Sequence, residues 1–224
     1  MINNILKVFT NINDSNLAFH VTNDKKQVIN SRKKLCEKYN LNYENLKYMK
    51  QTHSNVVEII NKNDKIYNSD AIVTNILQYP LLVMVADCIP ILFYDEVKKV
   101  IAVAHAGRNG TYLDISSNVI DTMINDFACN TKNIKILLGP SIQNCCYEVS
   151  DELALIASKN FGNDVVCNRN VNLQKINFKQ LINKGILENN IEISSVCTRC
   201  NGKNYYSYRN NKNCGRFAGV ICLQ

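Results

Sequence analysis

The amino-acid sequence predicts an α/β fold in which helices cover a mixed β-sheet, and three observations support this prediction. Segments with the patterns of strands and of helices alternate along the 224 residues. The middle of the chain, residues 81–104, is apolar on what would be both faces of its strands, as in a buried sheet. With only 8 Gly and 3 Pro, the chain also offers few natural linkers. We therefore expect one domain that spans residues 1–224.

The strands are expected where short apolar runs are bounded by polar turns. They are residues 6–10, 17–21, 56–60, 71–73, 81–86, 89–94, 100–104, 134–138, 191–196, 205–208 and 217–223. The helices are expected where apolar residues recur at helical spacing. They are residues 25–39, 115–127, 151–161 and 178–184. Ser150 is the expected N-cap of the third helix, and Gly185 ends the fourth.

The composition limits the possible partners and the compartment. The net charge of +7 comes from basic residues that are scattered along the chain, so a solvated surface is favoured over a nucleic-acid patch. The longest apolar run, residues 79–94, is interrupted by Pro80, Asp87 and Pro90, and no membrane span is expected. The first residues show no secretory signal pattern. We expect a cytoplasmic protein, a monomer or homodimer, whose ten cysteines are reduced.

Three potential metal ligands stand at or near the ends of expected strands. His105 follows residues 100–104 and precedes Ala106-Gly107, Cys88 follows residues 81–86, and His53 precedes residues 56–60. Strand ends that meet at one rim of a sheet can bring such side chains together. Two His and one Cys leave a fourth position open, as in a catalytic zinc site, and Asp87 can orient a ligand or water. His20 lies inside an expected strand and is read as a structural histidine.

Other interpretations of the cysteines remain open. Structural thiols and imidazoles outnumber metal ligands in proteins, so the three residues can also be plain packing residues. The CxxC at Cys197 and Cys200, with Cys214 downstream, is a possible half of a structural zinc site. The adjacent Cys145 and Cys146 are interpreted as structural, because neighbouring residues are poorly suited to chelating one metal together.

Three arginines lie beside glycine or polar turns, where guanidinium groups can bind phosphate with two hydrogen bonds. They are Arg108, Arg209 and Arg216. A surface salt bridge is the alternative for each of them.

Short segments along nearly the whole chain match, in order and spacing, the motifs of one known family. They are residues 16–21 (NLAFHV), 51–54 (QTHS), 69–74 (SDAIVT), 86–90 (ADCIP), 105–107 (HAG), 139–142 (GPSI), 146–149 (CYEV), 197–198 (CT), 206–209 (YSYR) and 215–216 (GR). The chain thus resembles the bacterial laccase-domain proteins, also called polyphenol oxidoreductases, peptidoglycan-editing factors or YfiH-like proteins.

The resemblance implies a three-layer α/β/α sandwich with a mixed sheet and a zinc site at His53, Cys88 and His105. It also implies purine nucleoside chemistry: phosphorolysis of adenosine, inosine and methylthioadenosine, and deamination of adenosine. The catalytic residues would then be Asp87, Cys88 and His105. The family usually reads HAGWRG after the last zinc ligand, whereas this chain reads HAGRNG at residues 105–110, so Arg108 stands one position early.

Three other functions were compared with this one. A multicopper oxidase needs roughly ten His ligands, and this chain has 3 His, so a multicopper site is not expected. A cysteine hydrolase or amidase in peptidoglycan editing would use Cys88 as nucleophile and His105 as base. A non-catalytic zinc-binding protein would bind the metal without turnover.

Overall fold

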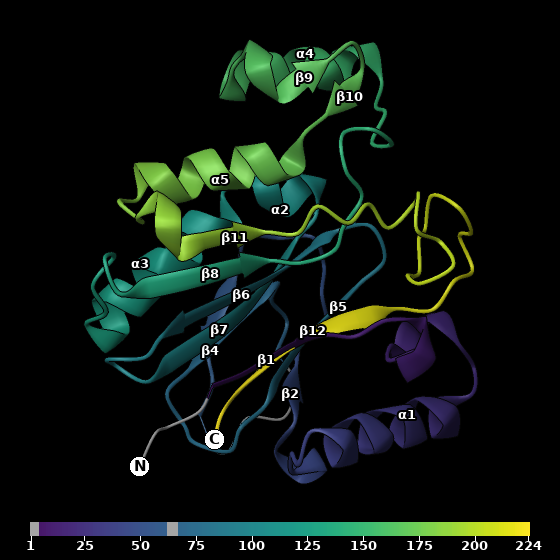
Figure 1. Ribbon diagram of the computed structural model, residues 1–224, viewed down its shortest axis with the longest axis vertical. Helices are drawn as coiled ribbons and strands as arrows, with labels where there is room; N and C mark the ends of the chain where they lie inside the picture. Colours follow the sequence, from purple (N-terminus) through teal and green to yellow (C-terminus); the bar gives the residue numbers. More distant parts are fainter. Residues whose placement is uncertain (1–4, 62–66) are drawn as a thin grey trace.

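The computed structural model of the protein describes residues 5–61 and 67–224 and contains two packed β-sheets between outer helices (Figure 1). The larger sheet has six strands in the order β11-β8-β6-β7-β4-β3. Its strands are β3 (Val57–Ile59), β4 (Ala71–Thr74), β6 (Ile89–Asp95), β7 (Val100–Ala106), β8 (Ile134–Leu138) and β11 (Ile191–Ile193). The sheet is mixed, because β3 runs parallel to β4 and β11 parallel to β8, while the inner pairs are antiparallel.

The smaller sheet has four strands in the order β1-β12-β5-β2. They are β1 (Ile5–Phe9), β2 (Lys47–Tyr48), β5 (Leu81–Val85) and β12 (Phe217–Leu223). Strands β1 and β12 pair antiparallel, which joins the two ends of the described chain. A short hairpin of β9 (Val166–Cys167) and β10 (Asn170–Val171) lies outside both sheets.

Five α-helices lie outside the two sheets in the part of the chain described. They are α1 (Lys25–Lys38), α2 (Arg108–Tyr112), α3 (Ile115–Phe127), α4 (Asp151–Phe161) and α5 (Leu173–Asn183). Helix α1 packs on the smaller sheet, and α3 and α5 lie on the far side of the larger sheet (Figure 1). Helix α4 lies beyond α5, beside the hairpin of β9 and β10 (Figure 1). Five 3-10 turns complete the described elements: Ile12–Asp14, Phe19–Val21, Tyr43–Asn45, Glu188–Asn190 and Asn163–Val165. None of the helices among residues 5–61 and 67–224 is both long and apolar enough to cross a bilayer.

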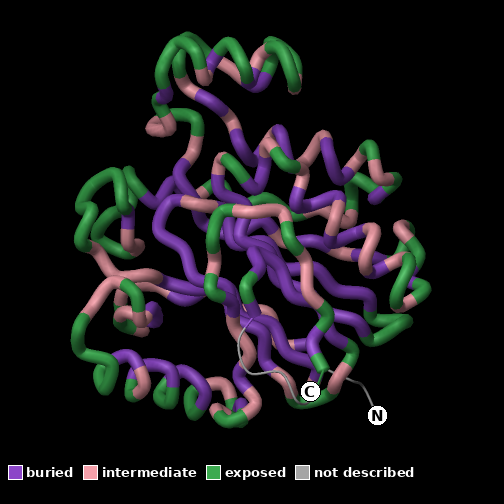
Figure 2. The backbone as a smooth tube through the Cα atoms, turned by 180° about the vertical axis from the view of Figure 1, so that it is seen from behind, coloured by how far each residue is buried: buried purple, intermediate pink, exposed green. Residues whose placement is uncertain are grey.

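The core consists of three apolar layers that follow from this arrangement. The layer between the two sheets includes Leu92 and Ile101 from the larger sheet and Val83 and Phe217 from the smaller one. Figure 2 shows the strands as a buried centre, with exposed residues concentrated on the outer helices and loops. Each fully buried side chain of this size stabilises the fold by about 1.5–3 kcal/mol relative to exposure. The strands are apolar on both faces because each sheet is covered on both sides.

The α/β class, the mixed strand pairing and the outer helices are confirmed, and the structure adds that the strands divide between two sheets. The helices at 115–127 and 151–161 and the strand at 134–138 have the expected bounds. Ser150 caps α4, because its side chain accepts a hydrogen bond from the Leu153 amide. The helix expected at 178–184 begins earlier, at Leu173, after Asn172 caps it.

Two expected strands are wrong. Residues 17–21 hold the 3-10 turn Phe19–Val21, and residues 205–208 form turns rather than a strand. Both segments are rich in apolar or aromatic residues, but each packs beside the start of β12 instead of joining its ladder. The Leu17 amide donates to the Arg216 carbonyl, and the Tyr205 ring lies 5.2 Å from the Phe217 ring, centre to centre. Local pattern alone does not distinguish a strand from an irregular segment that buries the same side chains.

Candidate metal centre

The three potential metal ligands meet at one edge of the larger sheet. Cys88 precedes β6, His105 is near the end of β7, and His53 precedes β3. Because β6 and β7 are antiparallel and Pro90 pairs with His105, the start of one strand lies beside the end of the other. The ligand atoms of His53, Cys88 and His105 all lie within 4.8 Å of one another. The rings of His53 and His105 meet edge to face, with centroids 4.8 Å apart.

Gly107 makes this close approach possible. A Cβ atom at this position would lie 2.9 Å from Cys88 Sγ and 3.1 Å from His53 Cδ2. These distances are shorter than ordinary van der Waals contacts, so any side chain would displace a ligand. Gly107 is therefore needed for the space that it leaves beside Cys88 and His53. Its backbone φ is one that any residue can adopt, so backbone conformation alone does not require a glycine here.

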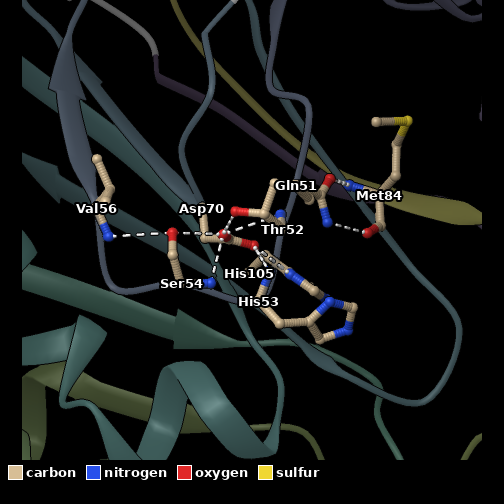
Figure 3. Close-up of polar contacts among 8 residues, drawn as sticks. All are labelled: Gln51, Thr52, His53, Ser54, Val56, Asp70, Met84 and His105. Atoms are coloured by element: carbon tan, nitrogen blue, oxygen red, sulfur yellow. Dashed lines mark hydrogen bonds and ion pairs between the residues drawn. The ribbon is translucent and has the colours of Figure 1, made fainter.

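Asp70, which directly precedes β4, connects the His53 loop to His105 through its carboxylate (Figure 3). One carboxylate oxygen accepts a hydrogen bond from the His53 amide at 3.0 Å and contacts His105 Nδ1 at 2.8 Å. The other oxygen accepts from the amides of Thr52 and Ser54 and from the Ser54 hydroxyl. Asp70 is fully buried. It therefore fixes the His53 loop and the His105 ring together, with His105 Nε2 left available as a ligand atom.

The backbone around the ligands is also held in uncommon conformations. His53 has a φ of 62° and Asp87 a φ of 85°. Left-handed conformations at non-glycine residues cost about 1–3 kcal/mol each and persist only where the surroundings hold them. The Gln51 side chain provides one such support, because its amide donates to the Met84 carbonyl at 2.7 Å and accepts from the Met84 amide at 2.9 Å (Figure 3).

The electrostatics of the site favour a thiolate. Burial disfavours the charged form of Cys88, but the neighbouring His105 and His53 outweigh it and lower the pKa of the thiol to about 6. Burial likewise opposes the charged form of His105, while Cys88 and Asp70 raise its pKa to about 9. Although burial works against it, Asp70 has a pKa well below its usual value because it accepts hydrogen bonds from His105 and Ser54.

A cavity of about 590 Å³ opens over the three ligands. Its lining consists of His20, Gln51, His53, Met84, Val85, Ala86, Asp87, Cys88, His105, Tyr147, Tyr208, Arg209 and Arg216. A volume of this size is typical of sites for small organic molecules. The burial of Tyr147, reinforced by the nearby Cys88, raises the pKa of its phenol to about 12, so it stays protonated and can donate a hydrogen bond.

The expected anion-binding arginines are separated by the fold. Arg209 and Arg216 line the cavity, whereas Arg108 lies outside its lining and bonds to Asn109 Oδ1 at 3.1 Å. The Arg209 guanidinium lies 5.0 Å from the centre of the Tyr147 ring. Across the residues that the structure describes, it makes no hydrogen bond or ion pair. Arg216 donates to the carbonyl oxygens of Cys214 and Gly215, which fixes its orientation.

Asp87 and His20 also lie in the cavity lining. Asp87 Oδ1 accepts from the Thr198 hydroxyl at 2.7 Å, and Oδ2 accepts from the Arg209 amide at 2.8 Å. The carboxylate thus joins the segment that carries Cys88 to the one that carries Arg209. His20 lines the cavity, but among the described residues it does not belong to the cluster of ligand atoms. Burial and the nearby Arg216 lower its pKa, so it is neutral near pH 7.

The residues fit a zinc ion. The donors are two imidazoles and a thiol with a lowered pKa, within one coordination sphere of each other, and a carboxylate orients one imidazole from behind. An ion held by these three residues would keep a fourth position open for water or substrate. A structural zinc site would instead be closed by a fourth side chain.

The roles of several supporting residues could not be predicted from the sequence, namely those of Gln51, Ser54, Asp70 and Tyr147. Asp70 lies within the family motif at residues 69–74, but its network joins residues 52–54 to residue 105, far apart in the chain. One local signal for Asp70 exists, because it is an acid directly before a fully buried strand, AIVT. The other roles depend on distances across the fold.

The chain is similar to known proteins over nearly its whole length. Residues 8–224 match the family model described as multi-copper polyphenol oxidoreductase laccase. Purine nucleoside phosphorylase YlmD of Bacillus subtilis (strain 168) is 27% identical over 93% of this chain and 82% of its own length. Adenosine deaminase RL5, from an unknown prokaryotic organism, is 30% identical over 92% of this chain and 86% of its own length.

A solved structure confirms the fold. The crystal structure of Bacillus licheniformis hypothetical protein YfiH superposes with a TM-score of 0.92 and 26% sequence identity, and the match covers 98% of this chain and 93% of the other. The family motifs, the arrangement of the sheets and the sequence match over residues 8–224 all lead to the same conclusion: the chain belongs to the multi-copper polyphenol oxidoreductase laccase family.

Proposed function

We propose that the protein is a zinc-dependent purine nucleoside enzyme that carries out phosphorolysis of adenosine, inosine and methylthioadenosine and deamination of adenosine. The observation that carries the proposal is the open cluster of His53, Cys88 and His105 at the base of a cavity whose wall holds Arg209 and Arg216. The names of the relatives, purine nucleoside phosphorylase and adenosine deaminase, support the choice of substrate class.

In this proposal His53, Cys88 and His105 hold the metal, and Asp70 fixes the tautomer of His105 by accepting its Nδ1 proton. When bound, zinc supplies a Lewis acid that can activate water near neutral pH. The lowered pKa of Cys88 means that little free energy is needed to form the thiolate ligand. The 590 Å³ cavity above the cluster is large enough for a nucleoside and its co-substrate.

Phosphate is assigned to Arg209 and Arg216. Among the described residues, the Arg209 guanidinium makes no hydrogen bond or ion pair and lies 5.0 Å from the centre of the Tyr147 ring, so its donors remain available for an anion. Negative charge held beside the sugar would stabilise a transition state that resembles an oxocarbenium ion. Arg108 is not assigned to phosphate in this proposal, because it lies outside the cavity lining and its side chain donates to Asn109.

The rest of the cavity wall would bind and orient the nucleoside. Tyr147 and Tyr208 offer aromatic surface on which a purine can stack. Asp87 keeps Arg209 in place through the Arg209 amide and is proposed to assist proton transfer to the leaving group. An Asp87→Asn protein that stays folded is expected to lose turnover while still binding zinc.

The direct test is to incubate the purified protein with adenosine, with and without phosphate, and to separate the products by chromatography. Adenine formed only with phosphate indicates phosphorolysis, and inosine formed in either case indicates deamination. His105→Ala is the metal-site control and Arg209→Ala the phosphate-site control, which should lose phosphorolysis more than deamination. A protein with bound zinc that forms neither product would contradict the proposal and leave a binding role.

A cysteine hydrolase or amidase is the second candidate, and one observation favours it. Cys88, His105 and Asp70 form the chain of nucleophile, base and orienting carboxylate found in cysteine hydrolases. The two functions differ in how the thiol reacts. A metal-bound thiolate resists iodoacetamide until zinc is removed, whereas a nucleophilic Cys88 is alkylated at once. Mass spectrometry of the peptide that contains Cys88 distinguishes them.

A further inference from the structure

Four cysteines gather at a second place, on two loops that leave the larger sheet side by side. Cys145 and Cys146 follow β8, and Cys197 and Cys200 follow β11. These two strands are parallel, and Ser141 forms an isolated parallel bridge with Cys197, so the loops leave the sheet together. The four Sγ atoms all lie within 4.8 Å of one another. Cys145 and Cys146, which were expected to be structural, therefore face the CxxC motif of Cys197 and Cys200.

The distances between the sulfur atoms match a metal site better than a disulfide. Cys146 Sγ lies 3.4 Å and Cys145 Sγ 3.7 Å from Cys200 Sγ. Zinc–sulfur bonds of about 2.3 Å in a tetrahedron place the sulfur atoms roughly 3.8 Å apart. A disulfide requires about 2.05 Å. The structure thus brings four soft donors to the spacing of one tetrahedral ion.

We propose that Cys145, Cys146, Cys197 and Cys200 form a structural Zn²⁺ site, separate from the cluster of His53, Cys88 and His105. Four thiolates complete the tetrahedron and leave no position for water or substrate, which is the arrangement of structural zinc. The Gln143 amide donates toward Cys197 Sγ at 3.5 Å, a contact that stabilises a thiolate ligand. Sulfur-only tetrahedral sites select zinc or iron–sulfur clusters over harder metals.

The site would hold one wall of the cavity. Tyr147, which lines the cavity, is next to Cys146, and Thr198, which bonds to Asp87, is next to Cys197. The Ile142 amide also donates to the Asp87 carbonyl at 2.9 Å. An ion shared by the two loops would cross-link them beneath Tyr147 and Asp87. Because Cys145 and Cys200 are exposed, the ion would also protect thiols that otherwise oxidise.

Metal analysis tests this proposal without relying on any enzyme activity. Zinc per chain is measured in the purified wild-type protein, in Cys145→Ser/Cys200→Ser and in His53→Ala. We expect about two zinc ions in the wild type and about one in each variant. The control is Cys167→Ser/Cys214→Ser, which changes two cysteines outside both clusters and should keep the wild-type zinc content.

Cobalt substitution and thiol titration keep the proposal testable if a variant folds poorly. In His53→Ala, Co²⁺ should give the intense thiolate charge-transfer bands of a sulfur-only tetrahedral site. Mercurial titration of the same protein should release zinc in step with thiol modification. The proposal is overturned if Cys145→Ser/Cys200→Ser binds as much zinc as the wild type. It is also overturned if the four cysteines form disulfides in protein purified without oxygen, or if the metal they bind is iron. Loss of nucleoside turnover alone would not affect it.

Discussion

At the scale of single residues, Asp70 connects the two segments that carry the histidines of the candidate metal centre. Its two oxygens together accept from three consecutive backbone amides, at residues 52–54, and contact His105. Few side chains can replace this carboxylate, because the groups around it donate hydrogen bonds and both of its oxygens accept them. The position therefore couples the shape of the His53 loop to the tautomer of His105.

Asp70→Asn is expected to weaken zinc binding by about 10- to 100-fold, because it directs an amide NH₂ at groups that already donate. It should also lower the free energy of unfolding by about 1–3 kcal/mol. Metal affinity is measured by competition with a chromophoric chelator, and stability by urea denaturation. Asp95→Asn is the matched control, since Asp95 is also fully buried and accepts from the Val97 and Lys98 amides. Equal zinc affinity in both variants would contradict the role of Asp70.

Gly107→Ala is expected to reduce zinc occupancy while the protein stays folded. The new methyl group would lie 2.9 Å from Cys88 Sγ, so one ligand must move. Zinc per chain after gel filtration is the measurement. Gly110→Ala serves as the control, because its methyl group would crowd the carbonyl oxygens of His105 and Ser54 but no ligand side chain. Full zinc content in Gly107→Ala would show that the site tolerates the methyl group.

At the scale of secondary-structure elements, helix α1 is joined to the smaller sheet by a buried arginine. Arg32 is 1% exposed and lies between the rings of Phe19 and Tyr48, 4.4 and 4.0 Å from their centres. Its Nε donates to the Leu17 carbonyl at 2.8 Å. The segment Phe19–Val21, expected as a strand, is held as a 3-10 turn beside this side chain.

Arg32→Ala is expected to destabilise the protein by about 3 kcal/mol, because it removes packed volume and two cation–π contacts. It also leaves the Leu17 carbonyl without its donor. Arg32→Met retains most of the volume and should cost less. Urea denaturation of both variants measures the difference. A loss in Arg32→Met equal to that in Arg32→Ala would show that charge, rather than packing, makes the larger contribution.

At the scale of the whole molecule, one edge of the larger sheet carries both proposed metal sites. The starts of β3, β4 and β6 and the ends of β7, β8 and β11 lie at this edge. Segments that adjoin these strand ends, such as those with His53, Cys88, His105 and Tyr147, supply much of the cavity lining, whereas the opposite edge carries the short turn between β6 and β7 at residues 96–99. Metal binding at this edge would stabilise the folded state as a whole, because the unfolded chain cannot form either site.

Removal of zinc by a strong chelator is expected to lower the thermal midpoint of the wild-type protein more than that of His105→Ala, which lacks one site. Each site is worth roughly 2.7 kcal/mol when metal is present at 100 times its Kd. For a chain of this size that is a fall of roughly 5–10 °C per site. Differential scanning fluorimetry gives the midpoints, and added zinc should restore them. Equal shifts in the two proteins would contradict a contribution from the His105 site.

The α/β class and the three clustered ligands could be predicted from the sequence because the signals are local. Apolar runs mark the buried strands, helical spacing marks α3 and α4, and His53, Cys88 and His105 stand beside strand ends. Gly107, two residues after His105, is a local signal as well, because a glycine after a strand end allows the backbone to approach a ligand closely. Each of these features depends only on a few neighbouring residues, so it is the same for any strand order that buries the strands.

Tertiary structure alone decided which distant segments meet. The division of strands between two sheets depends on pairing, such as β1 with β12, that joins opposite ends of the chain. Likewise, Asp70 reaches His105, Arg209 rather than Arg108 enters the cavity lining, and Cys145 and Cys146 face Cys197 and Cys200. The amino-acid sequence by itself determined the fold class and the chemistry of the donors. Their partners were decided by strand order, because hydrogen-bonded ladders bring together residues that no short-range pattern relates.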